Sequence, residues 1–306
     1  MGTAISAPVA EDGQRTQDDL PGNDRQIIRV FVRKTSQTPS DPYAFVGYPP
    51  LPMFMPEASE VHVSVTFTWD VQKANEIAEA WRQHYPVVKV GGPALDSPSN
   101  EFIPGRYVRP GVTFTTRGCN NKCEFCLVPQ REGLLREIEN PSPGTTIQDN
   151  NFLQANKNHI LKVCGMLRRQ GKPVTFAGGL DARLLKPWHV DELRGLKIDQ
   201  MFFACDHDSM RPHIERAASL LRNAFYKNRH GYMEQVRCYV LVGFWEETIE
   251  AVEDRLLFVL STGMMPFAML YQPPDRWIDY GPDWKTLQKN WVRPALIKMR
   301  NKGLSI

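Results

Sequence analysis

Three cysteines lie within eight positions of one another, in the segment 117–126. Cys119, Cys123 and Cys126 are separated by three and two residues, and they follow directly on a β-rich run, 112–116. Three thiolates on one loop can hold three irons of a [4Fe-4S] cluster and leave the fourth iron without a protein ligand. Such an open iron is a place where a substrate or a cofactor can bind.

Zinc is the metal that competes with this interpretation. A closed structural zinc site needs a fourth Cys or His ligand at a short spacing. No such residue follows the three cysteines, because His159 is 33 positions beyond Cys126. We therefore interpret the motif as a cluster loop, in preference to a zinc site or to three unligated thiols.

The elements that must position this loop alternate between strand-like and helix-like patterns. The predicted strands are 112–116, 174–177, 200–204, 236–242 and 267–271, and the predicted helices are 159–170, 190–196, 212–226 and 248–260. Such alternation predicts a parallel βα barrel, complete or partial, which places its chemistry at the carboxyl ends of its strands. The cysteine loop directly follows the first of these strands.

A smaller unit precedes the barrel. Strand-like runs at 27–32, 61–67 and 87–90 enclose a helical pattern at 74–81, which predicts a small α/β subdomain. Residues 1–24 are acidic and lack aromatic side chains, which predicts a disordered tail. The expected organisation is therefore a tail, 1–24, a subdomain, 25–108, a core barrel, 109–275, and a helical extension, 276–306.

Composition narrows the class of protein. Of 306 residues 42% are hydrophobic and 23% charged, and 37 Lys and Arg against 34 Asp and Glu leave a net charge of +3. This balance does not indicate nucleic acid, although the basic segment 285–306 keeps such a contact possible beside its more usual role as a solvated helix face. There is no long apolar run and no secretory signal, so we expect a cytoplasmic protein with no membrane contact.

The residues around the cysteines resemble a known family, the radical S-adenosylmethionine (radical SAM) enzymes. Thr-Thr-Arg-Gly precedes Cys119, Phe125 precedes the last cysteine, and Leu-Val-Pro-Gln-Arg-Glu-Gly follows it at 127–133. The nearest subgroup contains the cobalamin-dependent enzymes and the tRNA methylthiotransferases. The resemblance covers roughly 110–275 and implies an α/β fold with a partial (β/α)6 TIM-like barrel. More weakly, 61–94 resembles a shortened N-terminal domain of the cobalamin proteins.

The resemblance also implies cofactors and an activity. In this family a [4Fe-4S] cluster, here on Cys119, Cys123 and Cys126, binds S-adenosylmethionine at its open iron and cleaves it reductively. The resulting 5'-deoxyadenosyl radical abstracts hydrogen from a substrate, which the sequence does not identify. A reduced flavodoxin or ferredoxin-type protein is the expected electron donor. The alternative is a non-catalytic iron-sulfur protein, an electron carrier or a sensor.

Cofactor-binding residues follow from the same resemblance. A glycine pair after the second core strand binds the methionine amino group in the family, and Gly178 and Gly179 match it. Glycine suits a backbone that must approach a ligand closely. In the family an acidic residue usually follows the glycine pair directly. Here Leu180 stands in that position, and the acid, Asp181, comes one residue later. An electron carrier has no use for such a pocket, which argues against the alternative.

Further candidates end other predicted strands. The segment 240–246 resembles the strand that backs the adenine and supplies Gly243 and Glu246, and Phe125 is expected beside the cofactor. Cys205 and Asp206 end a strand at the same edge and are candidates for catalytic residues. For Cys205 we prefer the interpretation of a small buried hydrophobic side chain over that of a hydrogen-atom donor.

Departures from the subgroup exclude some of its activities. The segment before the motif contains no cysteine, so the second cluster of methylthiotransferases is not expected. The remaining cysteines, Cys164, Cys205 and Cys238, lie on three different predicted elements, which excludes an auxiliary cluster. Neither His62 nor His84 lies in the Asp-x-His-x-x-Gly context of a cobalamin ligand, so we expect no cobalamin.

Overall fold

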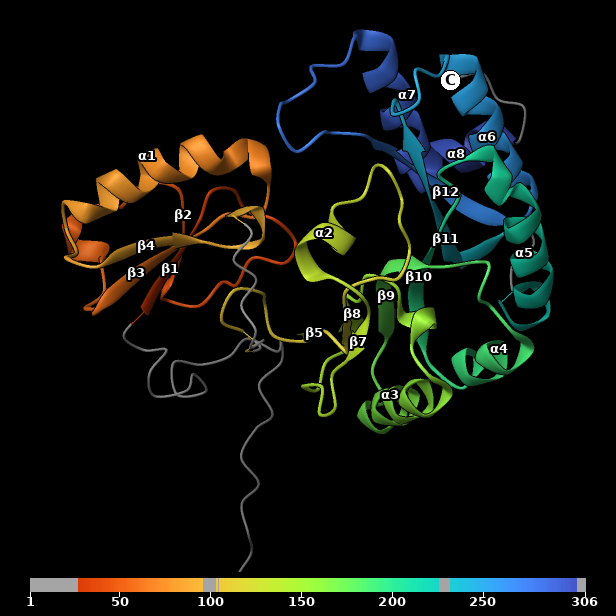
Figure 1. Ribbon diagram of the computed structural model, residues 1–306, viewed down its shortest axis with the longest axis horizontal. Coiled ribbons are helices and arrows are strands. Elements are labelled where there is room, and N and C mark those ends of the chain that lie inside the picture. Colours follow the sequence, from red (N-terminus) through yellow and green to blue (C-terminus); the bar gives the residue numbers. More distant parts are fainter. Residues whose placement is uncertain (1–26, 96–102, 104, 226–231, 302–306) are drawn as a thin grey trace, which may run out of the picture. The chain divides into compact units, whose positions relative to one another are not determined.

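The computed structural model describes residues 27–95, 103, 105–225 and 232–301 (Figure 1). The chain divides into two units, Met1–Val112 and Thr113–Ile306. Each unit has a hydrophobic core of its own. The expected disordered tail, 1–24, lies outside the described residues.

The first unit is a parallel four-stranded sheet with one long helix. The strands lie in the order β2 (Ala44–Val46), β1 (Ile27–Phe31), β3 (Glu60–Ser64) and β4 (Val88–Gly91). Helix α1 (Val71–Arg82) connects β3 to β4 and buries four side chains at helical spacing, Ala74, Ile77, Ala78 and Trp81. The expected β-α-β arrangement is therefore present. Strand β2 was not predicted, because it has only three residues and lies in a proline-rich segment.

The second unit contains a six-stranded sheet. Its order is β12 (Met264–Leu270), β11 (Met233–Val242), β10 (Ile198–Ala204), β9 (Val174–Leu180), β8 (Thr146–Ile147) and β5 (Val112–Thr113). The strands from β8 to β12 pair in parallel. The fold is thus α/β with parallel sheets, as the sequence predicts.

Four helices connect these parallel strands in turn. They are α3 (Lys157–Gln170), α4 (Pro187–Arg194), α5 (Arg211–Phe225) and α6 (Ile249–Ser261), and Figure 1 shows them following one another along one side of the strands. On β11 the side chains packed in this core alternate from Val236 onward, as Val236, Cys238, Val240 and Val242, whereas Met233 precedes an irregularity in the register. Residues of the opposite parity therefore belong to the other face of the sheet.

The predicted strand 112–116 is instead two short strands. After β5 the backbone N–H of Thr115 donates to Asp149 Oδ1 at 2.6 Å, and the hydroxyl of Thr115 binds the other carboxylate oxygen of Asp149. These contacts divert the chain, so β6 (Thr116–Arg117) leaves the sheet and pairs antiparallel with β7 (Arg136–Glu137). The cysteine loop starts directly after β6.

The C-terminal segment is helical, with α7 (Pro282–Val292) and α8 (Pro294–Asn301). Its apolar residues Leu287, Trp291 and Ile297 join the core of the second unit. In the same segment Lys285 binds Asp279 at 2.6 Å and Lys298 binds Glu234 at 2.5 Å. Two of the lysines in this basic segment are therefore neutralised by carboxylates of the chain itself.

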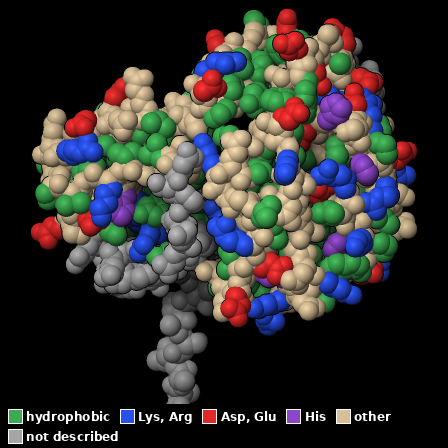
Figure 2. Space-filling model, in the orientation of Figure 1, with side chains coloured by type: hydrophobic (Ala, Val, Ile, Leu, Met, Phe, Trp, Pro, Cys, Tyr) green, Lys and Arg blue, Asp and Glu red, His purple; other side chains and the backbone are tan. Residues whose placement is uncertain are grey.

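On the face shown in Figure 2, Lys and Arg side chains are interspersed with Asp and Glu. Among the described residues, no helix combines the length and the apolar character that crossing a bilayer would require.

Candidate functional site

A glycine with no room for a side chain opens the cysteine loop. Gly118 has φ +79°, and a Cβ added to it would lie 2.3 Å from the carbonyl oxygen of Leu134. The next residue, Cys119, donates its backbone N–H to the carbonyl of Gly133 at 3.1 Å. A left-handed backbone in such close contact requires glycine. The start of the loop is thus fixed against the segment that follows it.

The carboxylate of Glu132, at the end of helix α2 (Val128–Glu132), holds the same region together. Its oxygens accept hydrogen bonds from Arg117 Nη2 at 2.8 Å, from the backbone N–H of Gly118 at 3.0 Å and from Asn150 Nδ2 at 2.8 Å. Hydrogen bonds to a charged group are stronger than those between neutral groups. The role of Glu132 was not visible in the sequence, because all three donors lie outside α2.

Uncharged amides continue this support. Gln154 accepts from the backbone N–H of Asn120 at 2.8 Å and donates to Asn121 Oδ1 at 3.0 Å. Asn121 in turn donates to Asp181 Oδ2 at 3.1 Å. The loop is thereby connected to the residues that follow β9.

The three thiols of the cysteine loop lie near one another. Cys119 is buried, and Cys123 and Cys126 are half-buried. Burial, and then the neighbouring charges of Cys126, Asp206 and Cys119, raise the pKa of Cys123. Burial and the charge of Cys119 likewise raise the pKa of Cys126. The sulfurs are close enough to influence one another electrostatically.

The donor set fits an iron-sulfur cluster by its chemistry. Soft thiolates favour such clusters over hard cations. In the described part of the chain, however, no three His, Cys, Asp or Glu side chains stand in an arrangement that could hold a metal ion. A [4Fe-4S] cluster binds each thiolate to a different iron, so Cys119, Cys123 and Cys126 need not converge on a single ion to hold it.

Phe125 brings the cysteine loop against the segment that follows β11. Its ring meets those of Phe244 and Trp245 edge to face, with both centroid distances 5.7 Å. Phe244 also packs against Trp245 and Tyr271, both at 4.7 Å. Two segments that the sequence singled out separately, the loop and 240–246, are thus in direct contact.

Gly243 and Glu246 lie in this segment but differ in setting. Gly243 has φ +81°, and a Cβ there would lie 2.8 Å from the ring of Tyr280. Glu246 is exposed and has φ 51°, an uncommon value for a residue other than glycine. Glu247, its neighbour, turns to the buried Arg255.

Gly178 and Gly179 lie inside strand β9 (Val174–Leu180). The sequence had predicted a strand at 174–177, with the glycine pair directly after its end. Neither glycine has a positive φ. A Cβ on Gly178 would lie 1.6 Å from the carbonyl oxygen of Asp149, whereas a Cβ on Gly179 would meet nothing within 4 Å. Gly178 is therefore required by packing, and Gly179 leaves open space beside the backbone.

Asp181 follows β9 and is buried. It accepts two hydrogen bonds from the Arg183 guanidinium, at 2.7 and 2.8 Å, beside the one from Asn121. Burial alone would raise the pKa of Asp181, but these donors outweigh it and hold the pKa below its ordinary value. The side chain is therefore a fixed carboxylate that links the loop to the end of β9.

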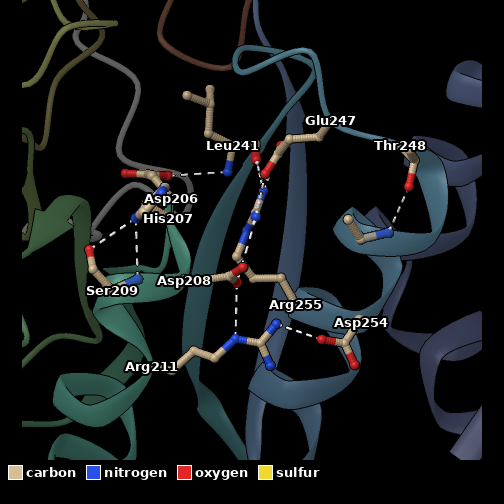
Figure 3. A network of polar contacts seen from close by, with 11 residues as sticks. Asp206, His207, Asp208, Ser209, Arg211, Leu241, Glu247, Thr248, Asp254 and Arg255 are labelled. Carbon is tan, nitrogen blue, oxygen red and sulfur yellow. Dashed lines mark hydrogen bonds and ion pairs between the residues drawn. The ribbon is translucent and has the colours of Figure 1, made fainter.

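Cys205 and Asp206 follow β10. Cys205 is fully buried, and burial raises the pKa of its thiol to about 12, in keeping with a small hydrophobic side chain. Asp206 accepts the backbone N–H of Leu241 at 3.1 Å (Figure 3), and burial raises its pKa to about 6. Asp206 is also among the charges that raise the pKa of Cys123 and of Cys126, so it lies near the loop.

A buried ion pair lies beside Asp206 in Figure 3. Arg255 of α6 is 1% exposed and binds Glu247 at 2.5 and 2.9 Å and the carbonyl of Leu241 at 3.0 Å. Removing one partner of such a pair costs about 3–5 kcal/mol, because the other charge stays buried. The pair therefore fixes the loop after β11 onto helix α6.

No family model matches the chain. A curated relative is the ribosomal protein uS12 methylthiotransferase RimO of Acidovorax sp. (strain JS42), 33% identical over 85 residues. That match covers 25% of this chain and 17% of the relative, so it spans about a sixth of the relative's length.

Solved structures match over much more of the chain. A radical S-adenosylmethionine methyltransferase, TsrM of Kitasatospora setae, with cobalamin and a [4Fe-4S] cluster bound, has a TM-score of 0.55 and 12% identity over 80% of this chain and 75% of its own. The same methyltransferase with its tryptophan substrate and aza-SAM, an analogue of S-adenosylmethionine, gives 0.54 and 12% over 81% and 73%. At this identity the match shows the fold. The likeness to the radical SAM family that the cysteine motif indicates is thus confirmed, locally in sequence and across most of the chain in fold.

Proposed function

We propose that this chain is a radical SAM enzyme built on a partial (β/α)6 barrel. It holds one [4Fe-4S] cluster on Cys119, Cys123 and Cys126 and cleaves S-adenosylmethionine reductively, coupled to removal of hydrogen from a substrate. The observation that carries the proposal is the contact of Phe125 with Phe244 and Trp245. It joins the cysteine loop to the segment that resembles the family's adenine-binding strand.

The chain's own residues have distinct roles in this proposal. The three thiolates hold the cluster, which supplies the electron for cleavage when it is bound. Phe125 and its aromatic partners exclude water from one side of the loop, since their rings pack against one another.

The residues at the end of β9 serve the cofactor. Gly179 leaves its backbone accessible to the cofactor's amino group, because it has no side chain and nothing lies within 4 Å of its Cβ position. Asp181 remains ionised because Arg183 and Asn121 donate to it. The carboxylate of Asp181, two residues after Gly179, can accept a hydrogen bond from the N–H of that amino group.

Two measurements test the proposal. Protein reconstituted anaerobically should bind about four irons, and replacing Cys119, Cys123 or Cys126 by Ala should abolish the absorbance of the cluster. Cys164→Ala is the matched control, because this thiol of α3 is fully buried in the core. This substitution should leave the iron content unchanged. Reduced protein supplied with S-adenosylmethionine should then form 5'-deoxyadenosine.

The outcomes separate the alternatives. A cluster without 5'-deoxyadenosine would indicate a non-catalytic electron carrier or sensor. Iron retained by the triple Ala variant, or one zinc in the native protein, would contradict the cluster itself. A reduced flavodoxin or ferredoxin-type donor and a cytoplasmic location stay predictions of the same proposal.

A further inference from the structure

Arg237 lies in the middle of β11, on the face of the sheet turned away from the core under helices α3–α6. Its side chain is 6% exposed. In the register of the sheet Arg237 pairs with Phe202 of β10, and Phe202 pairs with Gly179 of β9. Paired residues of parallel strands share a face, so Gly179, Phe202 and Arg237 form one row. Two strand spacings separate the backbones at the ends of this row, roughly 10 Å.

Two nitrogen atoms of the Arg237 side chain have no acceptor among the described residues. Its Nε and Nη2 atoms are shut off from solvent, and no described residue accepts a hydrogen bond from either of them. The two other buried arginines among the described residues are paired, Arg29 with Asp41 and Arg255 with Glu247. Burying a cation without a partner costs several kcal/mol. A buried and unpaired guanidinium is therefore an unusual feature of this chain.

Aromatic rings account for part of its environment. The guanidinium carbon lies 5.7 Å from the ring centroid of Phe202 and 5.2 Å from that of Phe267. Burial lowers the pKa of Arg237, and the group that opposes this is Tyr239, not a carboxylate. Rings attract a cation but offer no oxygen to its N–H groups. The N–H groups on Nε and Nη2 of Arg237 are therefore available to a ligand.

The surrounding wall is held in place. Tyr239 stacks on Phe202 with 4.5 Å between centroids and meets Phe267 edge to face at 5.7 Å. Its hydroxyl donates to the carbonyl of Ala177 at 3.0 Å, which fixes the ring to β9. The three rings thus form a preorganised apolar surface around the guanidinium.

We propose that Arg237 binds an oxyanionic group of the substrate, a carboxylate or a phosphate, while the substrate's apolar part lies against Phe202, Tyr239 and Phe267. The inference rests on the proposed function, because it places the substrate in the row that begins at Gly179. A planar guanidinium matches two oxygens of a carboxylate or a phosphate at once. S-adenosylmethionine also carries a carboxylate, so the test must separate the two sources.

The test measures the melting temperature of the reconstituted protein with three probes. Sodium benzoate represents an aromatic carboxylate, inorganic phosphate the other oxyanion, and L-methionine the carboxylate of the cofactor, all at an ionic strength matched with sodium chloride. At ten times its dissociation constant a bound probe should raise the melting temperature by roughly 3 °C. Benzoate or phosphate should produce this shift in the wild type.

Variants assign the shift to Arg237. Arg237→Met should abolish it, and Arg237→Lys, which keeps the charge but loses the fork, should weaken the affinity for the probe at least tenfold. Arg169→Met removes the same charge from an exposed position of α3 and should leave the shift unchanged. If Arg237→Met does not fold, the Lys variant decides.

Three results would overturn the inference. They are a wild type that responds to benzoate and phosphate no more than to chloride, a shift that survives in both Arg237 variants, and a response to L-methionine alone, which would assign the site to the cofactor. None of these readouts uses iron content or 5'-deoxyadenosine. A failure here is therefore distinct from a failure of the proposed function.

Discussion

The backbone of Gly178 passes so close to Asp149 that a Cβ at this glycine would lie 1.6 Å from the carbonyl oxygen of Asp149. The next residue, Gly179, has nothing within 4 Å of its Cβ position. Adjacent glycines in one strand therefore have different reasons to be glycine. The first allows two backbone segments to approach each other, and the second leaves space beside the backbone.

Alanine substitutions should separate these two roles. Gly179→Ala should keep the cluster and a near-native melting temperature but lose cleavage of S-adenosylmethionine, because its methyl group would occupy the space expected for the cofactor's amino group. Gly178→Ala should lower the free energy of unfolding by about 1–3 kcal/mol or more, the range for overpacked sites. Thermal unfolding and formation of 5'-deoxyadenosine measure the two effects. Wild-type cleavage by Gly179→Ala would remove that residue from the cofactor site.

Glu132 should govern how well the loop retains iron. Glu132→Gln replaces a charged acceptor of three donors by a neutral amide, and hydrogen bonds to a charged group contribute about 1.5–3 kcal/mol. We expect faster loss of iron to a chelator, with the folded core preserved. Glu124→Gln makes the same chemical change at an exposed position of the loop and serves as the control. Equal rates of iron loss in the two variants would show that the contacts of Glu132 do not support the loop.

Cobalamin should not bind with useful affinity. The ring of His62, one of two histidines in the first unit, is already engaged, with Nδ1 2.6 Å from the hydroxyl of Tyr107 and Nε2 2.8 Å from Glu60. Ligation of a metal by His62 would break one of these contacts. Titration with hydroxocobalamin, followed by its visible spectrum, measures uptake, and stoichiometric uptake would contradict the prediction. His62→Ala would then show whether this ring is the ligand.

His189 should make stability depend on pH. It is 4% exposed, and its Nδ1 accepts the backbone N–H of Lys186 at 3.0 Å. Burial, and then the charge of Lys186, lower the pKa of His189 to about 4. The unfolded chain, with a pKa near 6.5, therefore binds a proton that the folded chain resists.

The sign of the effect follows from this difference. Stability is unaffected above about pH 6.5 and falls as the pH decreases from there to about 4, by up to about 3 kcal/mol. Urea unfolding across this range should show a shallower decline in His189→Gln than in the wild type. His84→Gln changes an exposed histidine of the first unit and should keep the wild-type slope. Identical slopes in all three proteins would exclude His189 as the cause.

Hydrophobic periodicity predicted the regular elements of the second unit well. The expected helix at 212–226 corresponds to α5 (Arg211–Phe225), and the expected strand at 236–242 lies within β11 (Met233–Val242). Both depend on local alternation of apolar residues, which the sequence displays directly. The strand at 112–116 was wrong, because a carboxylate 34 residues away, that of Asp149, binds Thr115 and redirects the chain.

The supports of the site could not be predicted for the same reason. The cysteine spacing is local and identified the loop, whereas the donors to Glu132 and the pairing of Arg255 depend on how distant segments meet. Nothing in the sequence singled out Arg237, because an arginine in an apolar strand can be recognised as unpaired only when the residues around it in the fold are known. Local patterns thus reveal the ligands, and tertiary contacts determine what positions them.

The separate cores of the two units bear on which mutations the cysteine loop can tolerate. Each hydrogen bond and ring contact described for the cysteine loop is made within residues 113–306. Mutations that shorten or remodel the four-stranded sheet of the first unit therefore spare every one of these contacts. The N-terminal unit can in this sense change in sequence without altering any of the contacts described for the cysteine loop.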